Sequence, residues 1–362
     1  MNTSSALFQT IRLGSQTLAN RFARSATHDF MAREDGTVDD RQVALYRELA
    51  RGEVGLIITG HAFFRPEGKA SPRQMGVHED RMVEGLSRIS GAVHAFPAKV
   101  LLQIAHAGRQ TKERICGGRP VAPSAVFDPV SGVLPRALNA DEVAGLVGDF
   151  VAAAGRARAA GFDGVQIHAA HGYLLSSFLS PHTNRRRDEW GGSPDNRARI
   201  VVEIVRGIRN GLGRDFPVII KINADDFLED GVRVKDCVRV CRTLEAEGLD
   251  GFEISGGMAE AGRGSIWPGL RSEADEGYFL DAAARVKASV SVPVLGLGGW
   301  RTFRAMERAV EAGRADIVSL SRPLVRDPHL IRKFRTGELD RSDCVSCNKC
   351  LNPRGLRCRH ES

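Results

Sequence analysis

Long apolar runs are absent from this 362-residue sequence. No stretch approaches the ~18 consecutive apolar residues that a membrane-spanning helix requires, so we expect no membrane association. The first residues, MNTSSALFQTIRLGSQ, also lack the basic and then apolar layout of a secretory signal. We therefore expect a cytoplasmic protein.

Aromatic residues are scarce as well, at 6% of the chain. The formal net charge is +7, and the basic residues are mostly arginines scattered among acidic residues. A nucleic-acid-binding surface usually combines a basic stripe with interleaved aromatic residues, so we expect no nucleic-acid partner. The charge indicates only a mild preference for anionic ligands such as phosphates.

Apolar residues make up 42% of the chain and recur in a repeating order of apolar strand, Gly- or Pro-rich loop and amphipathic helix. Strands are expected at residues 22–26, 55–59, 99–103, 164–167, 217–222, 251–254, 292–296 and 317–320. Helices are expected at residues 41–51, 82–96, 140–160, 194–212, 234–247, 277–288, 302–312 and 328–336.

This alternation of strand and helix predicts an α/β fold, a (β/α)8 barrel. A doubly wound sheet is the alternative from the pattern alone, but no G-x-G-x-x-G follows the first strand. Residues 7–19 alternate weakly around Gly14 and Ser15 and predict a hairpin that caps the bottom of the barrel. No stretch resembles a linker. We therefore expect one domain over residues 1–340, followed by a short Cys-rich tail over residues 341–362.

Polar, proton-bearing side chains follow the fourth expected strand at once. The spacing H-x-x-H-x-Y comprises His168, His171 and Tyr173. In barrel enzymes the chemistry lies at the carboxyl ends of the strands, so these side chains are candidates for catalysis. A neutral imidazole can donate one N–H to an oxygen atom, and a phenol keeps its proton at neutral pH.

The run HAAHGYLLSSFLSPHTNRRRDEWGGSPDNR, which begins at His168, resembles the old yellow enzyme / 2,4-dienoyl-CoA reductase family of FMN-dependent oxidoreductases. Further motifs follow other strands in the order that the family has, and the resemblance extends from about Asn20 to Gly337. It implies an FMN-binding barrel with a small-molecule substrate and with NADH or NADPH as the reductant. The sequence does not distinguish between the two nucleotides.

The resemblance also implies a set of cofactor-binding residues. Ser25, Ala26 and Thr27 line the flavin ring, where Thr27 bonds it near the C4 carbonyl. Backbone at Gly60 lies against the ring. Gln103, in the segment QIAHAGR, bonds the pyrimidine edge of FMN, which suits an amide that both donates and accepts hydrogen bonds.

Lys221 lies within the apolar strand VIIKIN, where burial of a lysine is costly unless the lysine meets an anion. The family places a cation, often Arg, beside flavin N1 and the C2 carbonyl, where it stabilises the charge that develops on reduction. A lysine at this position replaces a forked donor by a point charge, so the reduction potential is expected to differ.

Glycine-rich loops follow the last two strands, and such loops commonly form a phosphate site in barrels. The seventh strand ends in Gly298 and Gly299, and the eighth ends in Ser321 and Arg322. The resemblance implies that these four residues bind the FMN phosphate.

The tail contains the spacing Cys344-x2-Cys347-x2-Cys350-x7-Cys358. In a reducing compartment, crowded cysteines suggest a metal or a cluster before disulfides. Larger members of the family have a [4Fe–4S] cluster at a similar place, although the last gap here is shorter. Three interpretations stay open: a retained cluster, a zinc site and remnant thiols.

We expect an ene-reductase, in which FMN is reduced by NAD(P)H and then reduces an α,β-unsaturated carbonyl compound. His168 and His171 would bind the carbonyl oxygen, and Tyr173 would protonate the α-carbon. One alternative is an amine dehydrogenase or demethylase, whose cationic substrate would face Trp267 and Trp300. Another is an electron-transfer protein fed by a redox partner. A flavin-free aldolase or isomerase fits the cofactor residues poorly, and a homo-oligomer is left open.

Overall fold

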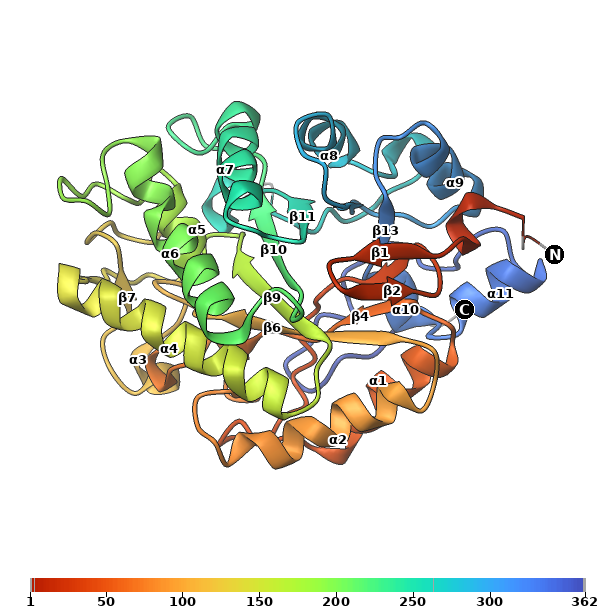
Figure 1. The fold of residues 1–362 in the computed structure, drawn as a ribbon, viewed down its shortest axis with the longest axis horizontal. Helices are drawn as coiled ribbons and strands as arrows, with labels where there is room; N and C mark the ends of the chain where they lie inside the picture. The colour runs from red at the N-terminus through yellow and green to blue at the C-terminus, as the bar shows by residue number, and fades with distance from the viewer. Residues whose placement is uncertain (1, 3, 263, 361–362) are drawn as a thin grey trace.

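The computed structural model describes residues 2, 4–262 and 264–360, and within them a parallel sheet closes into a barrel (Figure 1). Each barrel strand pairs in parallel with its neighbours, and pairing between β4 and β6 completes the ring. The eight strands that form it are β3 (Phe22–Arg24), β4 (Leu56–Ile58), β6 (Lys99–Ala105), β9 (Gly164–Ala169), β10 (Val218–Asn223), β11 (Gly251–Ser255), β12 (Val294–Gly296) and β13 (Ile317–Leu320). The expected (β/α)8 barrel is confirmed.

Helices surround the barrel, and the long ones match the expected segments within a few residues. They are α1 (Asp40–Arg51), α2 (Met82–His94), α4 (Ala140–Ala159), α6 (Pro194–Leu212), α7 (Val234–Ala246), α8 (Leu280–Lys287), α9 (Phe303–Glu311) and α11 (Leu330–Thr336). Local sequence explains their starts, because Asp39 and Asn139 form capping boxes and Ser193 caps a helix that begins with Pro194. The helix α8 begins three residues later than expected, because Gly277 has a φ of +69° and forms a turn.

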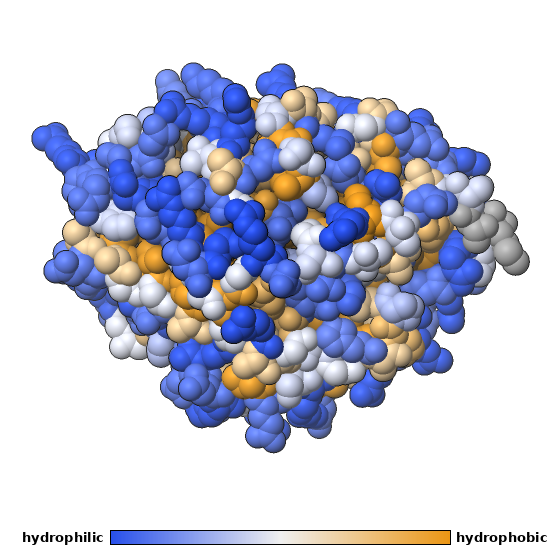
Figure 2. Space-filling model, viewed as in Figure 1, coloured by the Kyte–Doolittle hydropathy of each residue, from blue (hydrophilic) through white to orange (hydrophobic). Residues whose placement is uncertain are grey.

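Shorter elements occupy the connections. They are the helices α3 (Glu113–Cys116), α5 (Leu174–Leu179) and α10 (Arg322–Arg326), and the strands β5 (Ala62–Phe63), β7 (Val121–Ala122) and β8 (Arg136–Ala137). No helix in the described ranges is both long enough and apolar enough to cross a membrane. Polar residues cover most of the face in Figure 2, with apolar residues in small groups between them.

The expected hairpin is present as β1 (Ile11–Leu13) and β2 (Gln16–Leu18), and it closes one end of the barrel. Gly14 at its turn has a φ of +56°, which favours glycine. Leu13 and Leu18 are buried against side chains that point into the barrel from the strands, namely Ala23, Leu56, Ile58, Leu101, Ile219, Leu295 and Ile317. This apolar plug leaves the carboxyl ends of the strands as the open end.

The Cys-rich tail packs back across that open end. The Ser342 amide donates to the Arg301 carbonyl at 2.8 Å, and the Leu356 amide donates to the Asp29 carbonyl at 2.8 Å. The Ser346 carbonyl accepts from the Gly269 amide at 3.0 Å, which joins the tail to the loop after β11. The tail thus covers part of the rim at which barrel enzymes place their chemistry.

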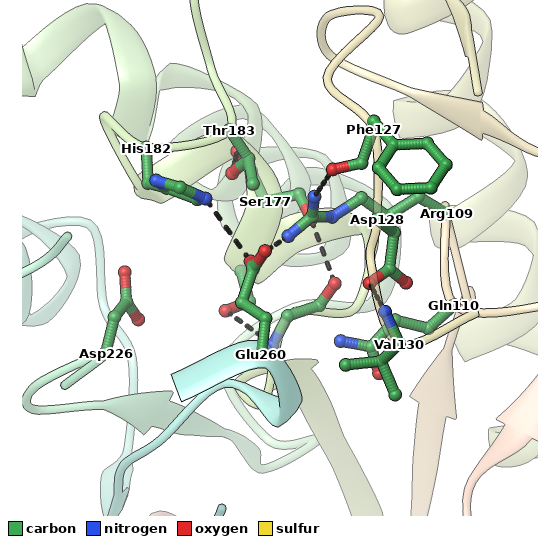
Figure 3. A network of polar contacts seen from close by, with 12 residues as sticks. Arg109, Gln110, Phe127, Asp128, Val130, Ser177, His182, Thr183, Asp226 and Glu260 are labelled. Carbon is green, nitrogen blue, oxygen red and sulfur yellow. Dashed lines mark hydrogen bonds and ion pairs between the residues drawn. The ribbon is translucent and has the colours of Figure 1, made fainter. Parts of the chain in front are cut away.

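A buried ion pair ties the loops of this rim together (Figure 3). Arg109, in the loop after β6, is 1% exposed and pairs with Glu260, in the loop after β11. The Arg109 guanidinium also donates to the Phe127 carbonyl at 3.2 Å, and His182 Nε2 lies 3.4 Å from a Glu260 carboxylate oxygen. Loops that follow three different strands therefore meet at one carboxylate.

We expect Leu18→Ala to destabilise the fold by about 2–5 kcal/mol, because it leaves a cavity beneath the barrel interior. The free energy of unfolding from denaturant titration measures the effect. Leu134→Ala, the same change at a side chain that is 51% exposed, is the matched control and should change stability by less than about 0.5 kcal/mol. Equal losses in the two variants would contradict the plug.

Glu260→Gln should cost about 3–5 kcal/mol, because Arg109 would keep a buried charge without its carboxylate. Calorimetric unfolding measures the loss. Asp281→Asn removes a carboxylate that is 92% exposed and pairs with Arg314, so it should leave the unfolding transition nearly unchanged. A Glu260→Gln variant as stable as this control would contradict the role of the ion pair.

Candidate active site

A cavity of about 390 Å³ opens at the carboxyl ends of the strands. Every barrel residue that we expected from the sequence to be catalytic or to bind the cofactor lines it, with the exception of Gly60. The Gly60 amide donates to the Tyr46 hydroxyl at 2.8 Å, and a Cβ atom there would lie 2.9 Å from the Thr27 carbonyl oxygen. Gly60 therefore packs against the backbone of the segment after β3 that carries Thr27.

The floor of the cavity carries a buried positive charge. Lys221 Nζ donates to Ser25 Oγ at 2.8 Å and lies 3.2 Å from a carboxylate oxygen of Glu253. Burial lowers the pKa of Lys221, and the charge of Glu253 opposes this shift. Glu253 escaped the sequence analysis, although a charged residue inside the apolar strand GFEIS is the same signal that identified Lys221.

Gln103 meets a second buried amide on this floor. Its Nε2 donates to Gln166 Oε1 at 2.7 Å, because the two residues are direct partners on β6 and β9. The carbonyl oxygen of the Gln103 side chain accepts no hydrogen bond within the described part of the chain, and Gln103 lines the cavity. A ligand with an N–H group can occupy this acceptor. Gln166 is a further residue that the sequence analysis missed.

His168, His171 and Tyr173 converge on one wall, as the H-x-x-H-x-Y spacing predicted. Ring centroids lie 5.3 Å apart for the two histidines and 4.9 Å apart for His168 and Tyr173. His171 reaches this position with a φ of +64°, while Asn223 Oδ1 accepts its amide at 3.0 Å. The Nδ1 atom of His168 is buried and has no hydrogen-bond partner in the described ranges.

Burial sets the protonation of this wall. It lowers the pKa of His171 to about 3 and holds the pKa of His168 well below its usual range. It also raises the pKa of Tyr173 to about 12. At neutral pH the wall therefore presents two neutral imidazoles and one protonated phenol, which can donate hydrogen bonds or a proton but carry no charge.

Two further histidines, His28 and His61, line the cavity beside this wall. Gln74 fixes the tautomer of His61, because its Oε1 accepts from the Ala70 amide at 2.6 Å and its Nε2 is then left to donate to His61 Nδ1 at 2.7 Å. Burial and the nearby charge of Lys221 lower the pKa of His61 to about 4. His61 is thus a neutral ring with its proton on Nε2. Its place directly after an expected strand was the available sequence signal.

Another part of the cavity lining combines glycines with a second cation. Gly298 and Gly299 have φ values of +133° and +75°, and a Cβ atom on Gly298 would lie 2.7 Å from the Tyr278 amide nitrogen. Arg322 is buried, donating to the Trp267 carbonyl at 2.8 Å and to Asn348 Oδ1 at 2.7 Å. This part of the lining can therefore hold an anionic group close to the backbone.

The four tail cysteines, Cys344, Cys347, Cys350 and Cys358, line one small hollow of about 20 Å³ next to Arg322. All four are free thiols, and Cys347 is exposed. Within the described ranges, no group of three or more His, Cys, Asp or Glu side chains is placed to hold a metal ion. The structure thus gathers the cysteines without ligand geometry, so neither a cluster nor a zinc site is confirmed in the tail.

Comparison with known proteins gives a consistent picture. The family model of the NADH:flavin oxidoreductase / NADH oxidase family matches residues 6–340. The NADH oxidase of Thermoanaerobacter brockii is 36% identical over 345 residues, which cover 94% of this chain and 52% of that protein. The NADPH dehydrogenase of Geobacillus thermodenitrificans is 34% identical over 334 residues, covering 91% of this chain and 93% of that one. The chain thus spans about half the length of some relatives and nearly all of others.

Solved structures of related proteins have the same fold as this chain. A 2-naphthoyl-CoA reductase in complex with 2-naphthoyl-CoA has a TM-score of 0.90 at 30% identity, over 98% of this chain and 57% of that one. An old yellow enzyme homologue from Zymomonas mobilis has a TM-score of 0.80 at 27% identity, over 94% and 95% of the two chains. The matched family model, the barrel and the cavity lead to one conclusion: this chain belongs to the NADH:flavin oxidoreductase / NADH oxidase family.

Proposed function

We propose that the chain uses FMN and NAD(P)H to reduce the activated C=C bond of α,β-unsaturated carbonyl compounds. The observation that carries this proposal is the wall of His168, His171 and Tyr173, three uncharged hydrogen-bond donors that face the same cavity as the cation Lys221. Reduction of a conjugated carbonyl needs a donor at oxygen and a proton at carbon, and this wall can supply both.

The cavity fits FMN. Two cations, Lys221 and Arg322, line it together with Gly298 and Gly299. The free acceptor of Gln103 suits an imide N–H, and the glycine backbones allow a phosphate to approach closely. Ser25, Ala26, Thr27 and Ser321 complete the lining. When bound, FMN supplies the hydride.

The protein side chains bind the substrate carbonyl oxygen and supply the proton. His168 and His171 donate hydrogen bonds to the substrate carbonyl oxygen and stabilise the negative charge that develops there. They remain neutral because burial keeps the pKa of each far below neutrality. Tyr173 holds a proton on its phenol oxygen and delivers it to the α-carbon. The raised pKa of Tyr173 keeps that proton available at neutral pH.

An amine substrate has less support. No carboxylate lines the cavity within the described ranges, whereas Lys221 and Arg322 both do, so a cationic substrate would meet like charges. Trp300 lines the cavity, but Trp267 does not and instead stacks on Tyr278 with ring centroids 4.2 Å apart.

An anaerobic absorption spectrum of the purified chain, with iron and sulfide assays, is the first test. We expect flavin absorption that NADH or NADPH bleaches and that an enone such as 2-cyclohexenone restores. The iron and sulfide assays separate a retained cluster in the tail from the other two interpretations, neither of which contains iron. Absence of enone-dependent NAD(P)H oxidation across a panel of enones, quinones and nitro compounds would contradict the proposed reaction.

Tyr173→Phe should slow reoxidation of the reduced flavin by an enone on the order of 10²- to 10⁴-fold, because the proton for the α-carbon is lost. Reduction by NAD(P)H should be nearly unchanged. Stopped-flow absorbance separates the two half-reactions. Tyr278→Phe removes the hydroxyl of another tyrosine of the same cavity and serves as control. If both variants reoxidise at the wild-type rate, Tyr173 is not the acid.

Titration of Tyr173 and of the cavity histidines should leave the enone half-reaction unchanged between about pH 6 and 10. The pKa of Tyr173 is raised to about 12, so its proton is present throughout this range and is lost only above it. The pKa values of His61 and His171, lowered to about 4 and 3, keep both rings neutral over the same range. A midpoint near pH 6–7 in the stopped-flow profile would indicate an imidazolium donor instead.

A further inference from the structure

Glu253 is the one carboxylate that the described residues place inside the barrel at the level of the cavity floor. It is fully buried on β11, and its carboxylate oxygens accept from Ser319 Oγ at 2.6 Å and from Gln166 Nε2 at 2.8 Å, while Lys221 Nζ lies at 3.2 Å. Three donors satisfy it. Although burial by itself raises the pKa of Glu253, Lys221 and these hydrogen bonds hold that pKa below its usual value.

Strand register explains the arrangement. Lys221 on β10 is the direct partner of Glu253 on β11, and Gln103 on β6 is the direct partner of Gln166 on β9. Side chains at paired positions of neighbouring strands point to the same face of a sheet. Both pairs therefore point into the barrel, where they meet just above the apolar layer on the hairpin.

A carboxylate accepts hydrogen bonds and cannot donate them, so it fixes the direction of the chain of bonds that begins at it. Gln166 must turn its NH₂ group to Glu253, which leaves its Oε1 for Gln103. Gln103 must then turn its NH₂ group to Gln166, which leaves its own Oε1 towards the cavity. If Glu253 is replaced by a residue that can also donate hydrogen bonds, the orientations of the Gln166 and Gln103 amides are no longer fixed.

The same carboxylate acts on Lys221. It neutralises the lysine as an ion pair, and it is the group that opposes the loss of the Lys221 proton on burial. Arg24 also acts on Lys221, and its positive charge favours loss of the Lys221 proton. The titratable rings around Lys221 are neutral, namely His61, His168 and His171. Glu253 thus keeps Lys221 charged and also cancels part of its field at the floor.

We propose that Glu253 is a positioning residue that sets both the acceptor face of Gln103 and the effective charge of Lys221 at the cofactor site, an inference that rests on the proposed FMN site. It acts through Gln166 and Lys221, without touching the cavity itself. The paired lysine stabilises a reduced, anionic flavin less than an unpaired cation would.

Glu253→Gln tests the effect on charge. While Lys221 stays protonated in this variant, the floor gains a net positive charge, so the FMN midpoint potential should rise above that of the wild type at about pH 6. Lys221 loses its proton more readily without Glu253, so this difference should shrink as the pH rises through the lowered pKa of Lys221. A purely structural role of Glu253 would not produce a pH-dependent difference.

Anaerobic redox titrations with indicator dyes at several pH values measure the potential on FMN-loaded protein. Glu307→Gln, a change of a buried carboxylate on α9 that accepts from Arg304 outside the barrel, is the control and should match the wild type at every pH. Potentials of Glu253→Gln that equal those of the wild type throughout would overturn the proposal.

Gln166→Leu tests the effect on the orientation of the Gln103 amide. It also tests the proposal if the Glu253→Gln variant fails to fold or to retain FMN. It leaves the Lys221–Glu253 ion pair in place but frees the Gln103 amide, so the FMN dissociation constant should rise about tenfold while the potential changes little. An unchanged dissociation constant would contradict the relay. These measurements involve no enone, so an inactive substrate panel refutes only the proposed reaction, whereas a chain that binds no flavin overturns both.

Discussion

Closure of the sheet between β4 and β6 is the constraint on which the rest of this molecule depends. In a closed parallel barrel all strands end on the same rim, so residues far apart in the chain become neighbours there. Thr27 and Ser321 are 294 positions apart, and their hydroxyl oxygens lie 2.7 Å apart. One end is filled by the apolar hairpin, so the other end is available for a polar cavity.

The interior of the barrel changes character along its axis. At the hairpin end it is apolar, with inward side chains such as Leu101, Ile219 and Ile317. One layer higher, two residues further along the same strands, Gln103, Lys221 and Ser319 replace them, and Glu253 on β11 joins this polar layer. Burial of this second layer is tolerated because each group has a partner, since an unpaired charge there would cost several kcal/mol. The polar layer forms a rigid floor beneath the cavity.

The rim is held by contacts between loops. Glu260 joins three of them through Arg109 and His182, and Arg322 joins the loop after β11 to the tail through Trp267 and Asn348. Loops on a barrel tolerate change in sequence, which is why one fold supports varied substrates. In this chain, an ion pair and the hydrogen bonds of Arg322 bridge the loops around the cavity.

The sequence by itself determined the order of strands and helices, the hairpin, and the strand ends that carry His168, Tyr173 and Lys221, because periodicity and strand-end position are local properties of a chain. It did not reveal Glu253, Gln166 or His61, whose importance depends on partners on other strands. From the spacing of Cys344 to Cys358 it left a cluster, a zinc site and remnant thiols open, and the structure brings these cysteines together without ligand geometry. The tertiary structure alone decides the strand register, the direction of the side chains and the pairing of buried charges. These are properties of contacts between strands and not of any one strand.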